Sequence, residues 1–365
     1  MFFPKGLFFL CVSVSLWLNL AVKKMQIKQL TNNDITPWNE FVFQHPDATF
    51  FHRAEWKEVI ERAFSHTMYF FFAEDEGEIV GVLPLGHVKS RIFGNSLVSI
   101  PFYVYGGILA KNEDVYLELA EKSKSLAKEL DVGYLEFRNI KPQSSDWPVK
   151  NDLYATFRKE IAPDADQILK SIPGKQRAVV RKGIKAGLIS VYDEDVDRFY
   201  ESYATTLHSH GTPAFPRKLF HILKEVFKQD CDILSIYKDD RMIASLMSFY
   251  FKDTVLPYYA GTSADSRVYN AHHFMYWELM RRSSEKGYKC FDFGRSKVDT
   301  GAFKFKTNWG FEPEYLNYEY YLVNATEIPD VNPNNPKYSL FIKAWQKMPF
   351  AMTKVIGPYI VRNLG

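Results

Sequence analysis

The sequence predicts an α/β fold with mixed sheets, built from two tandem units that share one order of elements and flank a helical insert. Three observations lead to this expectation. The length of 365 residues suits two domains better than one small module. Runs with strand and helix periodicity recur in the same order in both halves of the chain. Between these runs lies a stretch with helical patterns only.

The first unit begins at Met25, which opens a segment, MQIKQLTNND, that is typical of a first strand. Apolar runs then predict three further strands, and a helical stretch precedes a closing strand. In chain order we expect strands over 69–73, 79–88 and 97–100, a helix from about 115 to 130, and a strand over 133–137.

The second unit repeats this order of elements. Its expected strands cover 233–237, 242–251 and 255–259, and they precede a helix from about 270 to 286 and a strand over 288–293. Two segments also match at one offset, Tyr105-Gly106-Gly107 with Tyr259-Ala260-Gly261 and Gly133-Tyr134 with Gly287-Tyr288. We interpret the recurrence as a duplication; two unrelated units of similar order are the alternative. The element order resembles that of the Gcn5-related acyltransferase fold.

The helical insert opens at Pro173 and Gly174, a pair typical of a helix start, and its first helix ends at Gly187. Two more helices are expected over 195–208 and 217–228. We therefore expect a hydrophobic segment at 1–24, a first domain at 25–160, a second domain with the insert at 161–330, and a basic, aromatic tail at 331–365.

The N-terminal segment carries no charge over residues 6–22, which is the short limit for a membrane span. It lacks the small residues of a signal-peptide cleavage site. A membrane anchor and a start codon assigned too far upstream both remain as interpretations. Either one leaves the body of the protein in the cytoplasm, because Lys23, Lys24 and Lys28 follow the segment.

Composition excludes several classes of protein. The chain is 46% hydrophobic with a net charge of +3, which argues against global disorder and against a nucleic-acid coat. The three cysteines, Cys11, Cys231 and Cys290, are too far apart to predict disulfides or a metal site. Dinucleotide, P-loop, nucleophile-elbow and metalloprotease motifs are all missing from the sequence. We expect no metal and no tightly bound cofactor.

A basic stretch opens the insert. It contains Lys175, Arg177, Arg181, Lys182 and Lys185 and no acid. Arg177, Arg181 and Lys185 share one helix face, where like charges repel unless an anion lies between them. The stretch therefore predicts a phosphate-binding surface, with a solvated helix face as the alternative.

The segment 291–311 concentrates charged and aromatic residues after the last strand of the second unit. Asp292, Arg295 and Lys297 follow at the strand end, a place where open α/β sheets commonly bind ligands. Thr300 is expected to cap a short helix that carries Lys306. A lysine among aromatic residues needs a carboxylate, a phosphate or a polarised carbonyl as its partner.

At these residues the sequence resembles the Fem family of aminoacyltransferases, and more closely the FemAB-related proteins associated with exosortase and PEP-CTERM systems. The motifs that carry the resemblance lie at Leu256–Gly261 (LPYYAG), Gly211-Thr212-Pro213, 291–297, Thr300-Gly301 and 305–311 (FKTNWGF). The resemblance implies two tandem Gcn5-related domains and the transfer of an acyl group to an amine of a peptidoglycan or exopolysaccharide precursor. It also implies that Lys306 belongs to the active site.

We predict that Lys306 stabilises the oxyanion of the transfer step and that Asp292, near Tyr259, takes the proton of the amine. The residues predicted to bind substrate are Arg295, Lys297, Thr212, Lys175, Arg177 and Arg181. Pairing of Arg295 with Asp292 would instead make both residues structural. The donor stays open between aminoacyl-tRNA and acyl-coenzyme A. The Fem coiled-coil insertion is missing, and so are the glycines that usually cradle coenzyme A phosphates before the helix at 270.

Two rival functions remain. One is an acyl-coenzyme A-dependent N-acyltransferase of exopolysaccharide assembly, and the other is a catalytically degenerate protein that only binds polysaccharide or its assembly machinery. The tail after Asp330 holds five basic residues, several aromatic residues and no acid. It predicts contact with an anionic inner-membrane surface, with packing onto the domain as the alternative.

Overall fold

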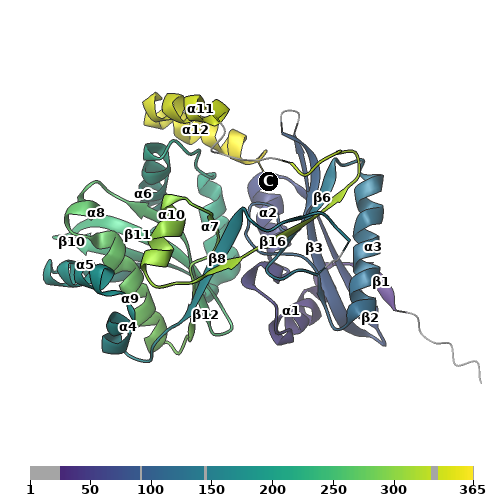
Figure 1. The fold of residues 1–365 in the computed structure, drawn as a ribbon, viewed down its shortest axis with the longest axis horizontal. Coiled ribbons are helices and arrows are strands. Elements are labelled where there is room, and N and C mark those ends of the chain that lie inside the picture. The colour runs from purple at the N-terminus through teal and green to yellow at the C-terminus, as the bar shows by residue number, and fades with distance from the viewer. Residues whose placement is uncertain (1–24, 91–92, 144–145, 330–335, 365) are drawn as a thin grey trace, which may run out of the picture.

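The computed structural model describes residues 25–90, 93–143, 146–329 and 336–364. These residues form two mixed sheets, each of eight strands, with helices between and outside them (Figure 1). The expectation of a membrane anchor or a misassigned start at 1–24 concerns residues outside this description.

The first sheet has the strand order β1-β2-β3-β4-β6-β16-β7, with β5 beside β3. Its only parallel pair among the described strands is β4–β6. The bounds are β1 (Gln26–Gln29), β2 (Thr67–Asp75), β3 (Glu78–Ser90), β4 (Gly94–Val98), β5 (Leu109–Ala110), β6 (Tyr134–Asn139), β7 (Val149–Lys150) and β16 (Asn317–Leu322).

The second sheet has the order β14-β8-β13-β12-β11-β10-β9, with β15 beside β8, and its parallel pair is β12–β13. The bounds are β8 (Tyr154–Glu160), β9 (Ile189–Asp193), β10 (Cys231–Lys238), β11 (Arg241–Phe251), β12 (Thr254–Thr262), β13 (Cys290–Asp292), β14 (Ser296–Lys297) and β15 (Pro313–Tyr315). Four antiparallel strands, a helix and a parallel strand thus occur in both sheets. The fold class and the repeated order of elements predicted from the sequence are confirmed.

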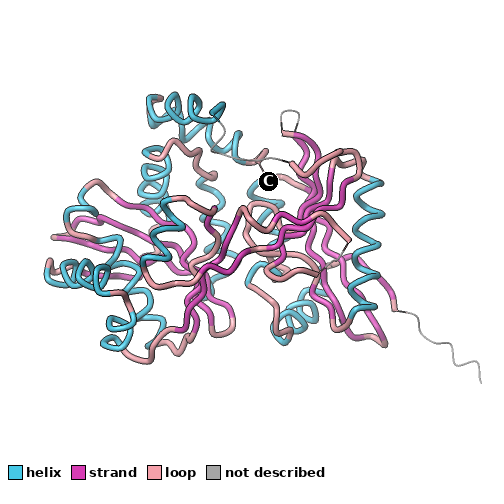
Figure 2. The backbone as a smooth tube through the Cα atoms, viewed as in Figure 1, coloured by secondary structure: helices cyan, strands magenta, loops and turns pink. Residues whose placement is uncertain are grey.

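The two halves exchange strands at their junction. Strand β8 belongs to the expected first domain but pairs with β13, whereas β16 comes from the expected second domain and pairs with β6. Both cross the middle of the molecule as long extended segments (Figure 2). The expected boundary at residue 160 therefore does not coincide with the border between the sheets. The reason is that β6 and β13 each take their last antiparallel neighbour from the other half.

The helices cover both faces of each sheet. Their bounds are α1 (Ile35–Gln44), α2 (Trp56–Phe64), α3 (Glu113–Glu129), α4 (Ala165–Ser171), α5 (Gly174–Lys185), α6 (Val196–Ser209), α7 (Arg217–Phe227), α8 (Asp265–Val268), α9 (Ala271–Glu285), α10 (Gly301–Asn308), α11 (Pro336–Lys347) and α12 (Phe350–Val361), with short 3-10 turns at η1 (Asn32–Asp34), η2 (Phe50–His52) and η3 (Lys228–Asp230). Helices α5, α6 and α7 match the predicted insert. Thr300 caps α10 as expected, since its hydroxyl accepts a hydrogen bond from the Phe303 amide.

A shared hydrophobic core joins the two halves. The period of two along β2 sends Phe70 and Phe72 into this core and Phe71 and Ala73 toward α3. The same core takes side chains from α1, α2, α6, α7 and β11, so it lies between the two sheets. A separate cluster fills the space between the second sheet and α4, α5 and α9. The two halves therefore share one hydrophobic core.

One match between the repeats fails at the residue level. Tyr105 lies in the loop after β4, whereas Tyr259 lies within β12. Only glycine fits at position 261 on β12 without a clash, because a Cβ there would come within 2.5 Å of the Ser202 and Tyr203 backbone on α6.

We expect Gly261→Ala to lower the free energy of unfolding by about 1–3 kcal/mol, because α6 must move away from the strand. Gly174→Ala is the matched control, since a Cβ at Gly174 would meet nothing within 4 Å. Urea unfolding of both variants measures the difference. Equal stability of the two variants would show that α6 and β12 separate at little cost.

Candidate active site

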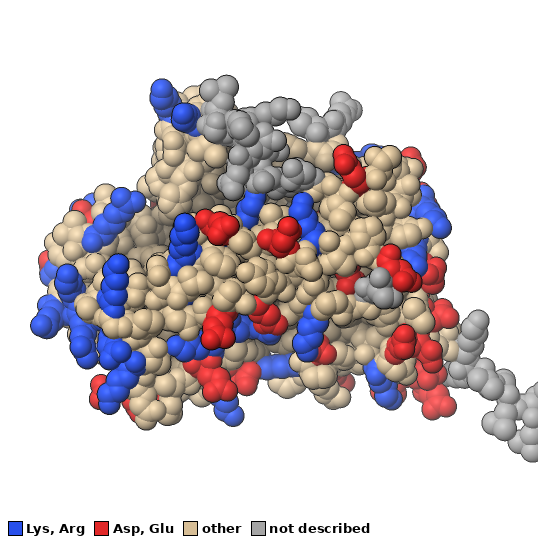
Figure 3. All heavy atoms as spheres, viewed as in Figure 1, with Lys and Arg blue, Asp and Glu red and all other residues tan. Residues whose placement is uncertain are grey.

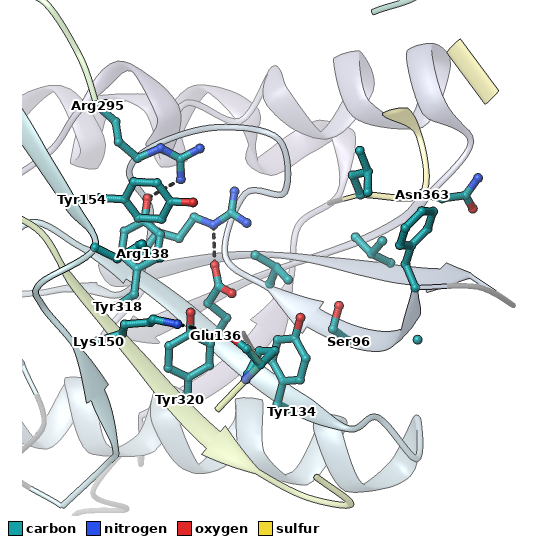
Figure 4. Close-up of a pocket in the computed structure, with 17 residues that line it drawn as sticks. Ser96, Tyr134, Glu136, Arg138, Lys150, Tyr154, Arg295, Tyr318, Tyr320 and Asn363 are labelled. Atoms are coloured by element: carbon teal, nitrogen blue, oxygen red, sulfur yellow. Dashed lines mark hydrogen bonds and ion pairs between the residues drawn. The ribbon is translucent and has the colours of Figure 1, made fainter. Parts of the chain in front are cut away.

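A cavity of about 350 Å³ opens beside the parallel pair β4–β6, next to the exchanged strands (Figure 4). Its walls combine charged side chains with tyrosines from both halves of the chain. The polar and aromatic residues of the wall are Ser96, Tyr134, Glu136, Arg138, Lys150, Tyr154, Arg295, Tyr318, Tyr320 and Asn363.

Arg138 is fixed in this wall by two strong contacts. Its Nε donates to Glu136 Oε1 at 2.6 Å, and its Nη1 donates to the Tyr103 carbonyl at 2.7 Å. Both Glu136 and Arg138 are almost fully buried, at 7% and 6% exposure. They share one face of β6 because they are two residues apart in a strand. The pair therefore presents a pre-oriented guanidinium to the cavity.

Arg295 reaches the same cavity from the turn after β13. Its Nη1 donates to the Tyr318 hydroxyl at 2.8 Å, and its guanidinium lies 4.3 Å from the centre of the Tyr154 ring. The Tyr318 hydroxyl in turn donates to the Val104 carbonyl at 2.9 Å. Tyrosine contacts hold the arginine in place without neutralising its charge.

Among the described residues that line this cavity, Arg138, Arg295 and Lys150 are basic and Glu136 is acidic. We call it the charged cavity. The planar guanidinium of Arg295, which is held by tyrosines, suits phosphate or carboxylate oxygens.

A second cavity of about 460 Å³ adjoins the first and shares Arg138, Arg295 and Leu364 with it. Its other polar lining residues are Tyr203, Thr212, Tyr258 and Tyr259. We call it the tyrosine groove. The groove lies where β12 carries a bulge, since Met247 pairs with Tyr259 while the next residue, Ser248, pairs with Pro257. Bulges of this kind redirect side chains and are frequent beside active sites.

Tyr259 lines the groove, and its hydroxyl interacts electrostatically with that of Tyr103 behind it. The hydroxyls of Tyr259 and Tyr103 are buried and lack a hydrogen-bond partner in the described part of the chain. Burial raises the pKa of Tyr259 well above its usual value, so the phenol stays protonated. A buried, protonated hydroxyl can donate a hydrogen bond to a substrate oxygen.

The turn that carries Arg295 is held from behind by Lys306. The Nζ atom donates to the carbonyls of Phe293, Gly294 and Arg295 at 2.7, 2.9 and 3.2 Å. Burial lowers the pKa of this lysine to about 7. Lys306 lines neither cavity, so in this structure it orders the turn that places Arg295.

Asp292 also lies behind the cavity wall. Its Oδ1 accepts from the Gly294 amide at 2.7 Å, the Tyr105 hydroxyl at 3.0 Å and the Thr156 hydroxyl at 3.4 Å. Burial raises the pKa of this carboxyl group. The residue joins β13 to β8 and to the first half of the chain, and among the described residues its hydrogen bonds do not include Tyr259.

We expect Asp292→Asn to lower the free energy of unfolding by about 1–3 kcal/mol, because an amide is a weaker acceptor for three buried donors. Asp239→Asn, at an exposed aspartate, is the matched control and should stay within about 0.5 kcal/mol of the parent. Guanidinium unfolding measures both. An unchanged midpoint for Asp292→Asn would contradict a structural role of the carboxylate.

The structure brings together only part of the predicted site. Arg295, Thr212 and Tyr259 meet at the tyrosine groove. Lys297 lines neither this groove nor the cavity beside it. The basic residues Lys175, Arg177 and Arg181 lie apart on α5, where Arg177 Nε donates to the Ile172 carbonyl. The predicted roles of these residues in binding and catalysis stay predictions.

Sequence reasoning missed Arg138, Glu136, Tyr154 and Tyr318. A signal for the first two exists, because Glu136 and Arg138 alternate with the apolar Leu135 and Phe137 at the end of the strand predicted over 133–137. Two opposite charges on one face of a buried strand predict a paired polar site.

The loop before α9 is already hydrogen-bonded to itself. The amides of Ser266, Arg267, Tyr269 and Asn270 donate to carbonyls within 263–267. In a phosphate-binding loop such amides would point to the ligand. This observation agrees with the lack of glycines at 267–271.

Clusters of three or more potential metal ligands do not occur among the described residues. Nor does any helix in those ranges combine the length and apolar character that crossing a bilayer requires.

Comparisons with known proteins find a GNAT-type domain in the second half of the chain. Residues 174–307 match a family described as an acetyltransferase (GNAT) domain. No curated protein matches the sequence. This domain supports an acyltransferase, whereas the exosortase-associated subfamily stays a prediction.

Three solved structures share the fold. The crystal structure of FemX superimposes with a TM-score of 0.64 at 15% identity, over 87% of this chain and 100% of FemX. The C-terminal domain of a putative lysylphosphatidylglycerol synthetase from Agrobacterium fabrum has a TM-score of 0.52 at 13% identity, over 78% and 92% of the two chains. A tandem GNAT protein from the clavulanic acid biosynthesis pathway has a TM-score of 0.51 at 12% identity, over 84% and 100%.

Proposed function

We propose that this acyltransferase moves an activated aminoacyl group to an amine of an anionic precursor of the cell envelope, in the cytoplasm. The observation that carries the proposal is the position of Arg138 and Arg295, which line both the charged cavity and the tyrosine groove. One cavity suits the anionic part of an acceptor, and the other suits the reacting groups. The resemblance to Fem enzymes supports an envelope precursor as the acceptor.

The anionic part of the acceptor, a phosphate or a carboxylate, binds Arg138 and Arg295. Its amine then extends into the tyrosine groove, where Thr212 and Tyr259 lie. The amine nitrogen attacks the carbonyl carbon of the donor, the ester bond to the carrier breaks, and the amine proton leaves with the departing hydroxyl group. The Tyr259 hydroxyl keeps its proton and donates a hydrogen bond to the oxyanion that forms on the carbonyl oxygen.

An ester donor such as aminoacyl-tRNA fits better than acyl-coenzyme A. The amides that would bind coenzyme A phosphates are occupied within the 263–270 loop. Helix α5 offers a different phosphate-binding surface, formed by Lys175, Arg177, Arg181, Lys182 and Lys185. Figure 3 shows basic side chains gathered over this helix. A polyanionic carrier can bind such a surface through its backbone.

The test incubates the purified full chain with tRNA charged with labelled amino acids, and in parallel with labelled acetyl-coenzyme A. A lipid and nucleotide extract of envelope precursors serves as acceptor. We expect label transfer from the tRNA arm, and loss of that transfer in Tyr259→Phe. Transfer from acetyl-coenzyme A alone would support the exopolysaccharide N-acyltransferase instead. Absence of transfer in both arms, with the acceptor still bound, would support the non-catalytic binding protein.

A further inference from the structure

Helix α12 exposes apolar side chains to solvent and turns its lysine toward the body of the protein, which is the reverse of an ordinary surface helix. Met352, Val355, Ile356 and Tyr359 are 49%, 65%, 36% and 66% exposed. They recur at the spacing of one helix face. We call them the outer face of α12. The lysine of this helix, Lys354, instead forms an ion pair with Glu201 of α6 at 2.9 Å.

The hairpin of α11 and α12 is firmly attached to the body. Trp345 is 2% exposed and packs beside Gly357. His208 Nε2 lies 3.0 Å from the Met348 carbonyl, and His66 Nε2 lies 2.6 Å from the Arg362 carbonyl. The outer face is thus held in place by contacts on the other side, and its exposure does not result from a loose helix.

We propose that the outer face of α12 docks on an anionic lipid bilayer. Residues 331–365 contain Lys337, Lys343, Lys347, Lys354 and Arg362 and no acid. Lys343 and Lys347 are exposed, and Figure 3 shows basic side chains at the outer end of the hairpin. Positive charge beside an apolar face complements anionic headgroups above an acyl-chain region. At 12 residues, α12 is too short to span a bilayer, so it lies in the interface.

Docking would place the active site at the lipid surface. Val361 at the end of α12 lines the tyrosine groove, Asn363 lines the charged cavity, and Leu364 lines both. The mouth of the cavities is therefore next to the docking face. If the proposed function holds, this position suits an acceptor that is linked to a membrane lipid through phosphate.

Vesicle flotation of the full chain tests the docking. We expect binding to vesicles of phosphatidylglycerol and phosphatidylcholine, and at least tenfold weaker partitioning to phosphatidylcholine alone. The double variant Val355→Asp/Ile356→Asp should partition to the phosphatidylglycerol-containing vesicles at least tenfold more weakly than the parent. Leu117→Asp, at a leucine that is 51% exposed on α3, is the matched control and should bind like the parent.

Hydrogen exchange of the same samples locates the contact. We expect vesicles to slow amide exchange within 350–361 and to leave the exchange rates of α3 unchanged. Flotation that persists in the double variant without protection of 350–361 would assign binding to another segment and overturn the proposal. Equal binding to both kinds of vesicle would overturn the role of anionic lipid. A dimer by light scattering that protects α12 without lipid would assign the face to a second copy of the chain. These readouts do not depend on transfer activity, so the proposal can fail separately from the proposed function.

Discussion

Arg295→Ala is expected to lower kcat/KM for the acceptor by about 30- to 150-fold, which corresponds to about 2–3 kcal/mol for a charge-assisted hydrogen bond. The loss should appear mainly as a higher KM, because Arg295 binds the anionic part of the acceptor rather than the reacting carbonyl. The guanidinium contacts Tyr318 and Tyr154 and has no carboxylate partner in the hydrogen bonds of the described residues. Its charge is therefore available to a ligand.

Two variants sharpen this measurement. Arg295→Lys keeps the charge but loses the planar contact with Tyr154, so it should recover only part of the lost affinity. Arg198→Ala is the matched control, because Arg198 is a surface arginine that already pairs with Asp193 and Asp195. Steady-state kinetics with varied acceptor concentration give kcat and KM separately. An unchanged KM in Arg295→Ala would place the anion outside the charged cavity.

The sequence predicted the elements of this fold well because periodicity is a local signal. The β2, β3, β10 and β11 strands and helices α3 and α9 all follow from apolar spacing within the chain. The exchange of β8 and β16 could not be predicted in this way. A strand of six or seven residues shows which face is buried but does not show which sheet supplies its neighbour.

The site was predicted in part for a related reason. Arg295 lies in a segment rich in charged and aromatic residues, which is visible in the local sequence. Arg138 comes from β6, and it meets Arg295 only because the exchanged strands bring the two halves together. For Lys306, the sequence predicted a carboxylate, a phosphate or a polarised carbonyl as its partner, and the structure supplies three carbonyls. The structure shows that those carbonyls belong to the chain itself.

This geometry changes what a substitution at Lys306 should do. A purely catalytic role for Lys306 predicts that Lys306→Met folds normally and loses turnover. The structure instead predicts a loss of about 2–4 kcal/mol in the free energy of unfolding, because three buried carbonyls lose their donor. Activity should also fall at least tenfold, since the turn that places Arg295 loses its support. Lys304→Met, at an exposed lysine on the same helix, is the matched control and should keep both properties.

The pH dependence of stability separates this role from simple packing. Burial lowers the pKa of Lys306 from its usual value of 10.5, which applies to the unfolded chain, to about 7. Between these values the unfolded state holds more protons, so the free energy of unfolding rises with pH by up to about 1.4 kcal/mol per unit. Lys306→Met lacks this contribution. The stability gap between parent and variant should therefore widen as the pH is raised from 7 to 10, as measured by urea unfolding at fixed ionic strength. A gap that stays constant over this range would mean that the three carbonyls keep the ammonium group charged despite its burial.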